Sequence, residues 1–289
     1  MADERDGSAA LEVEVTPRAA ALTSSIPDNI LECYQRLESD IAGPYFVSLK
    51  LEPRVLESIR PQLNDLFRRY DYDADAGIIT IRMPSKIHDD FATEFGLVLR
   101  KLIDDTLRAV PNAPRITDRQ SRLVKLWEHD KAKKGGECYP DGQFKDDRAS
   151  KPGLVYEVGY SQTGESLEKV AKDYIVGTKR AVTTVVCFNL KYNEGHSILH
   201  QRRSRQSVTW NPRQVSHHTG GQELIYLSQA FQDSNGRMVN GDKLVKLRLT
   251  DMAKEKYSDD YPLAPVHIPF TELSRILDFA KAQPEGSSP

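Results

Sequence analysis

The sequence contains no long hydrophobic run. No stretch of its 289 residues approaches the roughly 18 apolar residues that a membrane-spanning helix needs. The first residues, from Met1 to Asp6, are acidic and lack the apolar segment of a secretory signal. These absences predict a protein of the cytoplasm or the nucleus that has no membrane partner.

Cysteines and several familiar motifs are also scarce. Cys33, Cys138 and Cys187 are an odd number without a CxxC spacing, which argues against a disulfide framework and a structural zinc site. The chain has no G-x-S-x-G elbow, no Walker loop and no Rossmann glycine fingerprint. The common hydrolase, NTPase and dehydrogenase classes are therefore disfavoured.

Neither acidic nor basic residues are in large excess. The 40 basic residues nearly balance the 42 acidic ones, so the net charge of -2 gives no overall attraction to nucleic acid. Such contacts must come from local basic patches, and two patches are nearly free of acidic residues. They consist of Lys131, Lys133 and Lys134, and of Arg202, Arg203 and Arg205. These side chains are the candidates for phosphate contacts, although charge runs are usually solvated faces.

The chain divides simply along its length. Residues 1–25 and 283–289 lack hydrophobic periodicity and are predicted to be disordered ends. No repeat with a period of about 20–50 residues occurs between them. We therefore expect a helical extension over residues 26–69 and one α/β domain over residues 70–282, with a mixed central sheet flanked by helices.

Periodicity predicts the main elements of this α/β chain. Apolar residues at helical spacing predict helices over residues 28–37, 52–69, 84–108 and 166–176. Short β-branched or apolar runs predict strands over residues 78–83, 123–127, 154–160, 183–190, 207–210, 223–231 and 244–250. The turn at residues 233–236 predicts an antiparallel hairpin between the last two strands.

One predicted strand carries an acidic residue in an otherwise apolar segment. Side-chain alternation along residues 154–160 places Val155, Glu157 and Gly159 on one face of the strand. A second acid, Asp141, lies upstream in a turn. Two buried carboxylates repel each other unless a cation lies between them. Mg²⁺ suits such a pair because it binds oxygen ligands and retains several waters.

A third acid lies on the predicted helix 84–108. Glu94 comes three residues after Phe91 and four before Val98, so it falls on the inward face of this helix. A carboxylate at that position is costly unless it is paired, hydrogen-bonded or bound to a metal. Glu94 is therefore either a further metal ligand or an acid at the edge of the apolar stripe that reaches water.

Asp141 and Glu157 belong to a pattern that resembles a known superfamily. Pro140-Asp141, then Glu157 in a hydrophobic strand, then a helix and the strand 182–188 resemble the core of PD-(D/E)xK (restriction-endonuclease-like) nucleases. The segment from Glu157 to Gln162 is similar to a group of uncharacterised fungal proteins related to the Uma2-type family of proposed endonucleases. This resemblance covers roughly residues 70–192.

The resemblance implies a restriction-endonuclease-like core and a nuclease that depends on a divalent metal. It implies that Asp141 and Glu157 bind Mg²⁺ or Mn²⁺, with Glu94 as a third acid, and that the bound ion activates water for hydrolysis of DNA or RNA. Nucleic acid is then the expected partner, and a second copy of the chain is a further candidate partner.

The sequence departs from the superfamily at one position. The superfamily's lysine normally stands two residues after the strand acid, where this chain has Gly159. Gln162, just past the strand, or Lys169, on the following helix, is a candidate to orient water in its place, although Lys169 lies beside the apolar stripe and can also be a solvated residue. The alternative is a catalytically inactive nuclease-like fold that serves as a nucleic-acid or protein binding module.

Overall fold

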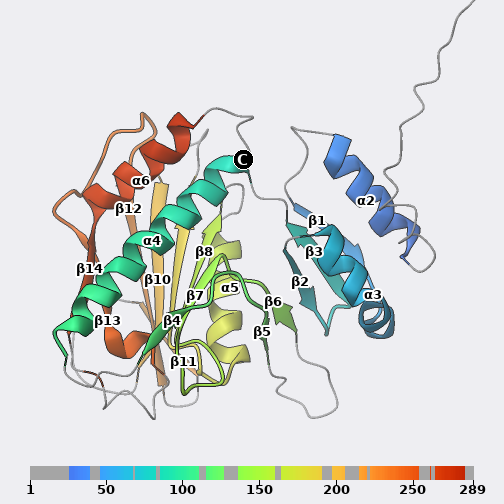
Figure 1. Cartoon of the computed structure of the whole chain (residues 1–289), viewed down its shortest axis with the longest axis horizontal. Coiled ribbons are helices and arrows are strands. Elements are labelled where there is room, and N and C mark those ends of the chain that lie inside the picture. The colour runs from blue at the N-terminus through green and yellow to red at the C-terminus, as the bar shows by residue number, and fades with distance from the viewer. Residues whose placement is uncertain are drawn as a thin grey trace, which may run out of the picture.

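The computed structural model describes most of the chain between residues 26 and 283. The described residues are 26–39, 46–67, 69–82, 85–110, 115–126, 136–159, 164–190, 197–205, 215–219, 222–253, 261 and 264–283. They form an α/β structure with a mixed sheet flanked by helices (Figure 1), which confirms the predicted fold class. The predicted strand 207–210 and the predicted disordered ends, apart from residue 283, lie outside the described residues.

The larger sheet, sheet B, has seven strands in the order β11-β12-β10-β9-β8-β7-β4. Only β8 and β9 run parallel among these neighbours, and the other pairs are antiparallel. In chain order the strands are β4 (Ile116–Asp118), β7 (Gly142–Asp146), β8 (Leu154–Gly159), β9 (Thr184–Asn189), β10 (Ser197–Arg205), β11 (Val215–Thr219) and β12 (Gln222–Gln232).

Helices cover both faces of sheet B (Figure 1). These are α4 (Lys86–Arg108) and α6 (Phe270–Ala282) on one face and α5 (Gly164–Gly177) on the other. Strand alternation explains the two layers, because Tyr156 and Val158 of β8 join the apolar cluster with α4 whereas Val155 joins the cluster with α5. No helix among the described residues has the length and apolarity needed to cross a lipid bilayer.

A second sheet, sheet A, lies beside sheet B and is built mainly from the N-terminal part of the described chain (Figure 1). Its order is β1-β3-β2-β6-β5, and α2 and α3 pack against it through a separate apolar cluster. The elements are α2 (Asp28–Ser39), β1 (Phe46–Lys50), α3 (Pro53–Leu66), β2 (Tyr70–Asp73), β3 (Ile78–Arg82), β5 (Val124–Lys125) and β6 (Glu137–Cys138).

Two features of sheet A go beyond the predicted helical extension. Strand β1 lies within residues 26–69 and pairs with β3, so the sheet includes strands from both sides of residue 70. Strands β5 and β6 return to it from much later in the chain. From β6 the chain passes directly into β7 of sheet B through Tyr139, Pro140 and Asp141. Asp141 therefore stands where the two sheets meet.

The predicted hairpin between residues 223–231 and 244–250 is wrong. Strand β12 pairs with β10 and β11, whereas β13 (Leu244–Arg248) pairs with β14 (Pro265–Pro269) in a separate two-stranded sheet. After the turn at residues 233–236 only a single bridge, between Gln232 and Met238, continues the pairing. Val245 and Leu247 instead bury their side chains in the cluster that includes α6.

Candidate functional site

Asp141 and Glu157, 16 positions apart in the sequence, are brought together where the two sheets meet. Gly142 of β7 pairs with Tyr156 of β8, so Asp141, one residue before β7, lies opposite Glu157. The backbone N–H of Val158 donates to Asp141 Oδ2 at 2.5 Å. Asp141 has a side-chain exposure of 0% and Glu157 one of 3%. Two acids are thus buried side by side.

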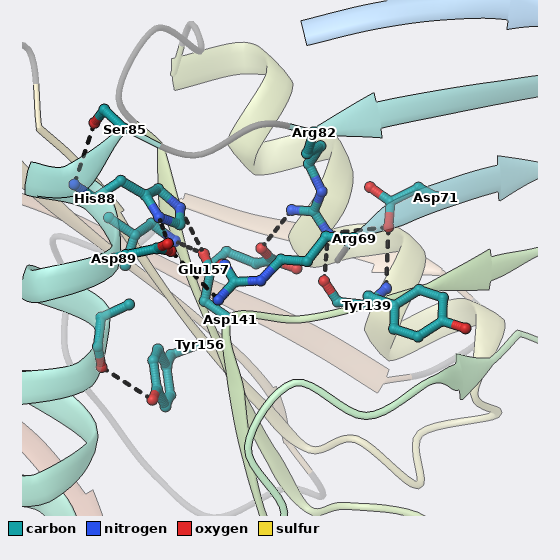
Figure 2. Close-up of polar contacts among 12 residues, drawn as sticks. Arg69, Asp71, Arg82, Ser85, His88, Asp89, Tyr139, Asp141, Tyr156 and Glu157 are labelled. Carbon is teal, nitrogen blue, oxygen red and sulfur yellow. Dashed lines mark hydrogen bonds and ion pairs between the residues drawn. The ribbon is translucent and has the colours of Figure 1, made fainter. Parts of the chain in front are cut away.

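Two arginines from sheet A compensate the charge of these acids. Arg69 pairs through Nη1 with Asp141 Oδ1, and Arg82 donates from Nη1 to Glu157 Oε2 at 2.9 Å (Figure 2). Arg69 precedes β2 and Arg82 ends β3, and the N–H of Arg82 donates to the carbonyl of Arg69 at 3.1 Å. The arginines are therefore neighbours at the open end of one hairpin.

The helices contribute one further contact to each acid. His88, in the first turn of α4, places Nε2 3.2 Å from Asp141 Oδ2. Tyr174 of α5 donates its hydroxyl to Glu157 Oε1 at 2.7 Å. Ser85 caps α4 by accepting from the N–H of His88 at 3.2 Å, which fixes the start of the helix and the place of this imidazole. Both helices and both sheets thus converge on the acid pair.

Two further acids, Asp71 and Asp89, contact the second Nη atom of each arginine, and we call them the outer acids. Arg82 Nη2 donates to Asp71 Oδ1 at 3.0 Å, and Arg69 Nη2 lies 3.5 Å from Asp89 Oδ1. Asp71 also accepts from the backbone N–H of Tyr139 at 3.0 Å. We call this set the acid–arginine cluster: Arg69, Asp71, Arg82, His88, Asp89, Asp141 and Glu157. When all its members are ionised, three cations face four carboxylates.

The cluster shifts the protonation of its members in different directions. Burial raises the pKa of Glu157 to about 7, an effect that Arg82 opposes but does not cancel. Burial lowers the pKa of His88, but the adjacent Asp141 outweighs it and raises this pKa to about 9. His88, followed by Arg69, holds the pKa of Asp141 below its usual value despite burial. These shifts favour the charged forms of Asp141 and His88 at neutral pH and place the pKa of Glu157 near neutral pH.

The acid pair has the chemistry of a magnesium site, but its oxygens already have protein partners. Oxygen donors of this kind are the ligands that Mg²⁺ and Mn²⁺ prefer. Each of the four oxygens of Asp141 and Glu157 contacts a donor of Arg69, Val158, His88, Tyr174 or Arg82. Within the described part of the chain, no group of three or more His, Cys, Asp or Glu side chains is arranged to hold a metal ion. A cation can bridge the two acids only if the arginines withdraw.

Known proteins give no further guide to this site. No protein-family model and no curated protein matches the chain. The resemblance to PD-(D/E)xK nucleases therefore rests on the motif residues and on the placement of the acids.

The remaining predicted residues lie apart from the acid pair or outside the described residues. Glu94 is half-buried on α4, and its charge acts on Arg275 of α6. Lys169 has a side-chain exposure of 71% and pairs with Asp173 one turn along α5 at 2.9 Å. Gln162 and the patch Lys131, Lys133 and Lys134 are outside the described residues, as are the side chains of Arg202, Arg203 and Arg205 in β10.

The sequence predictions missed the two arginines, although a usable signal was present. The turn at residues 73–77 between Tyr72 and Ile78 indicates a β-hairpin, and continuing its pairing outward brings Arg69 opposite Arg82. Two cations at the end of a buried hairpin require anions nearby. This requirement, combined with the two acids of the motif, would have favoured arginine rather than metal as the immediate counter-ion.

Proposed function

We propose that the chain is a divalent-metal-dependent nuclease that hydrolyses phosphodiester bonds of DNA or RNA, with Asp141 and Glu157 as ligands of Mg²⁺ or Mn²⁺. One observation carries the proposal: the two motif acids are buried cross-strand neighbours at the start of β7 and in β8. The succession β8, α5, β9 supports it, because it repeats the strand, helix and strand of the resemblance. When bound, the metal would activate water and offset charge on the phosphate.

The basic members of the acid–arginine cluster suit a phosphodiester substrate. A guanidinium fork matches the geometry of phosphate and remains charged at any physiological pH. Arg69, Arg82 and the imidazolium of His88 all contact the acid pair, so they would border a phosphate held there. Their role would be to bind and orient the phosphate while the acids hold the cation.

The group that orients water remains a proposal with three candidates. Lys169 is exposed and would have to leave Asp173, while Gln162 follows β8. A third candidate, Asn189, pairs with Gly159, where the superfamily's lysine would stand. Because Val185 and Cys187 of the same strand face α5, alternation places Asn189 on the face that carries Glu157. Its side-chain oxygen is buried and has no hydrogen-bond partner within the described part of the chain.

The proposal includes the cellular location and the partners of the protein. A chain with an intracellular nuclease function would act in the cytoplasm or the nucleus, with DNA or RNA as its partner. The two basic patches at residues 131–134 and 202–205 would contribute phosphate contacts that are independent of base sequence. A homodimer would place two such sites on one nucleic acid.

A cleavage assay tests the proposed activity. Plasmid DNA, single-stranded DNA and RNA are incubated with the protein in Mg²⁺, in Mn²⁺ and in EDTA. We expect cleavage with either metal, none in EDTA, and a loss of about 10²–10³ in rate for Glu157→Gln and Asp141→Asn. The matched control is Asp146→Asn, which alters a buried, arginine-paired acid of β7 outside the cluster. It should cleave normally per folded molecule.

One observation favours a second function, an inactive nuclease-like fold that binds nucleic acid or protein. Asp141 is completely buried, and the arginines already satisfy the charge of the acid pair. A protein with this function would bind single-stranded or double-stranded nucleic acid equally well in EDTA and in Mg²⁺. Wild-type protein that binds but cleaves none of the three substrates with either metal would support this second function and contradict the first.

A further inference from the structure

Each arginine of the cluster bridges an inner acid and an outer acid. Arg82 holds Glu157 through Nη1 and Asp71 through Nη2, at 2.9 and 3.0 Å. Arg69 holds Asp141 through Nη1, while its Nη2 lies 3.5 Å from Asp89. A guanidinium that leaves the inner acid therefore keeps a carboxylate partner. An arginine that gives up Asp141 or Glu157 is therefore not left as an unpaired buried cation, which would be strongly destabilising.

The two arginines also come from one hairpin. Both stand at the open end of the β2–β3 hairpin of sheet A, joined by the hydrogen bond from the N–H of Arg82 to the carbonyl of Arg69. The inner acids belong to sheet B and to the connection that leads into it. Asp71 lies in β2 and Asp89 in α4, so each guanidinium can turn from its inner acid to its outer acid by a change of side-chain conformation.

The present position of Arg82 is incompletely satisfied. Its side chain is buried, with a residue exposure of 8%, and its Nε has no hydrogen-bond partner among the residues that the structure describes. A buried donor without an acceptor carries a free-energy cost that a different position can relieve. Both Nη atoms of Arg82 have acceptors, in Glu157, Asp71 and the carbonyl of Tyr139, so this cost is confined to Nε.

We infer that Asp141 and Glu157 form one cation site with alternative occupants: Arg69 and Arg82 in the metal-free protein, and a divalent cation in the active protein. This inference rests on the proposed function, since it takes the acid pair to be the metal site. The two guanidinium groups thus act as built-in competitors of the metal, and their withdrawal toward Asp89 and Asp71 opens the site to the cation.

Binding of Mn²⁺ tests the competition without reference to catalysis. Free Mn²⁺ is measured by electron paramagnetic resonance during titration of wild-type protein, Arg82→Gln and Arg82→Lys. Removing a competitor should tighten binding, by about tenfold for Arg82→Gln, a typical size for coupled equilibria. Arg82→Lys retains the charge but not the fork, so its affinity should lie between the two, and it provides the comparison if Arg82→Gln does not fold.

The matched control is Arg60→Gln. Arg60 of α3 pairs with Glu137 and Glu57, at the same sheet but outside the acid–arginine cluster. Its loss should leave the affinity for Mn²⁺ unchanged. Equal or weaker binding in both Arg82 variants, or no Mn²⁺ binding by any variant, would overturn the inference.

Cleavage measured in the same samples separates the two claims. Tighter Mn²⁺ binding by the Arg82 variants without cleavage by wild-type protein would support the competition and contradict the nuclease function. Metal-dependent cleavage by wild-type protein, with Mn²⁺ affinity insensitive to Arg82, would contradict the competition and leave the nuclease function standing.

Discussion

A negative charge on Glu157 is costly because the side chain is buried. It is buried beside Asp141, and burial raises its pKa to about 7 even though Arg82 and Tyr174 contact both of its oxygens. A neutral side chain of the same shape can accept from Arg82 without the cost of a buried negative charge. The packing of the fold alone therefore does not require an acid at this position.

This argument predicts stability effects of different size for two substitutions in metal-free protein at pH 7. Glu157→Gln should change the free energy of unfolding by less than about 1 kcal/mol, in the range of a single net hydrogen bond. Glu157→Ala should lower it by about 3 kcal/mol, because the contact of Arg82 is lost and its charge stays buried. Urea unfolding in EDTA measures both, and equal losses would contradict the argument.

His88 predicts how stability depends on pH. Its pKa is about 9 in the folded protein, because Asp141 outweighs the lowering effect of burial, and about 6.5 in the unfolded chain. The folded state binds this proton more tightly, so the contribution is fully present below pH 6.5 and is lost as pH rises through 9. At about 1.4 kcal/mol per pH unit, it amounts to at most about 3 kcal/mol.

The measurement is urea unfolding of metal-free protein between pH 8 and pH 9.5, a range that lies above the Glu157 pKa of about 7. Wild-type protein should lose stability across this range, and His88→Gln should lose much less. A wild-type profile no steeper than that of the variant would show that His88 is not charged in the folded state.

Among the elements, β7 is positioned by a glycine at its first residue. A Cβ at Gly142 would lie 2.2 Å from Cζ and from the hydroxyl oxygen of Tyr156. The ring of Tyr156 is buried, and its hydroxyl donates to the carbonyl of Ala92 on α4 at 3.1 Å. Only glycine allows the strands to pair at this distance beneath that ring. The next residue upstream is Asp141, so the same glycine sets the position of the acid.

We predict that Gly142→Ala lowers the free energy of unfolding by about 1–3 kcal/mol, as expected for overpacking of a filled core. It should also weaken Mn²⁺ binding, because the Asp141 carboxylate moves with the start of β7. Thermal or urea unfolding and the Mn²⁺ titration test the two effects. A variant with wild-type stability would mean that Tyr156 moves aside freely.

The elements that the sequence could predict are those with a long hydrophobic pattern. Strands β8 and β9 and helices α4 and α5 have such patterns, and the alternation in β8 correctly places Glu157 on the face of Val155, which the structure shows to pack against α5. Strands β5 and β6 have two residues each, too few for any period to appear. The partner of β12 could not be predicted either, because pairing with β10 rather than β13 depends on contacts distant in the sequence.

At the scale of the whole molecule, the acid–arginine cluster joins two separately packed sheets. Sheet A encloses its own apolar cluster with α2 and α3, while sheet B is covered by α4, α5 and α6 (Figure 1). The acids could be predicted from a local motif. Their counter-ions could not, since Arg69 and Arg82 meet the acids only through the way in which the sheets adjoin.

The central claim is that Asp141 and Glu157 share a cation which the arginines otherwise replace. Anomalous diffraction from crystals of the wild-type protein soaked in Mn²⁺ tests it most directly. The account predicts one Mn²⁺ peak between the carboxylates of Asp141 and Glu157, with Arg69 and Arg82 withdrawn toward Asp89 and Asp71. Crystals that bind Mn²⁺ elsewhere or not at all, with both arginines still on the inner acids, would contradict it.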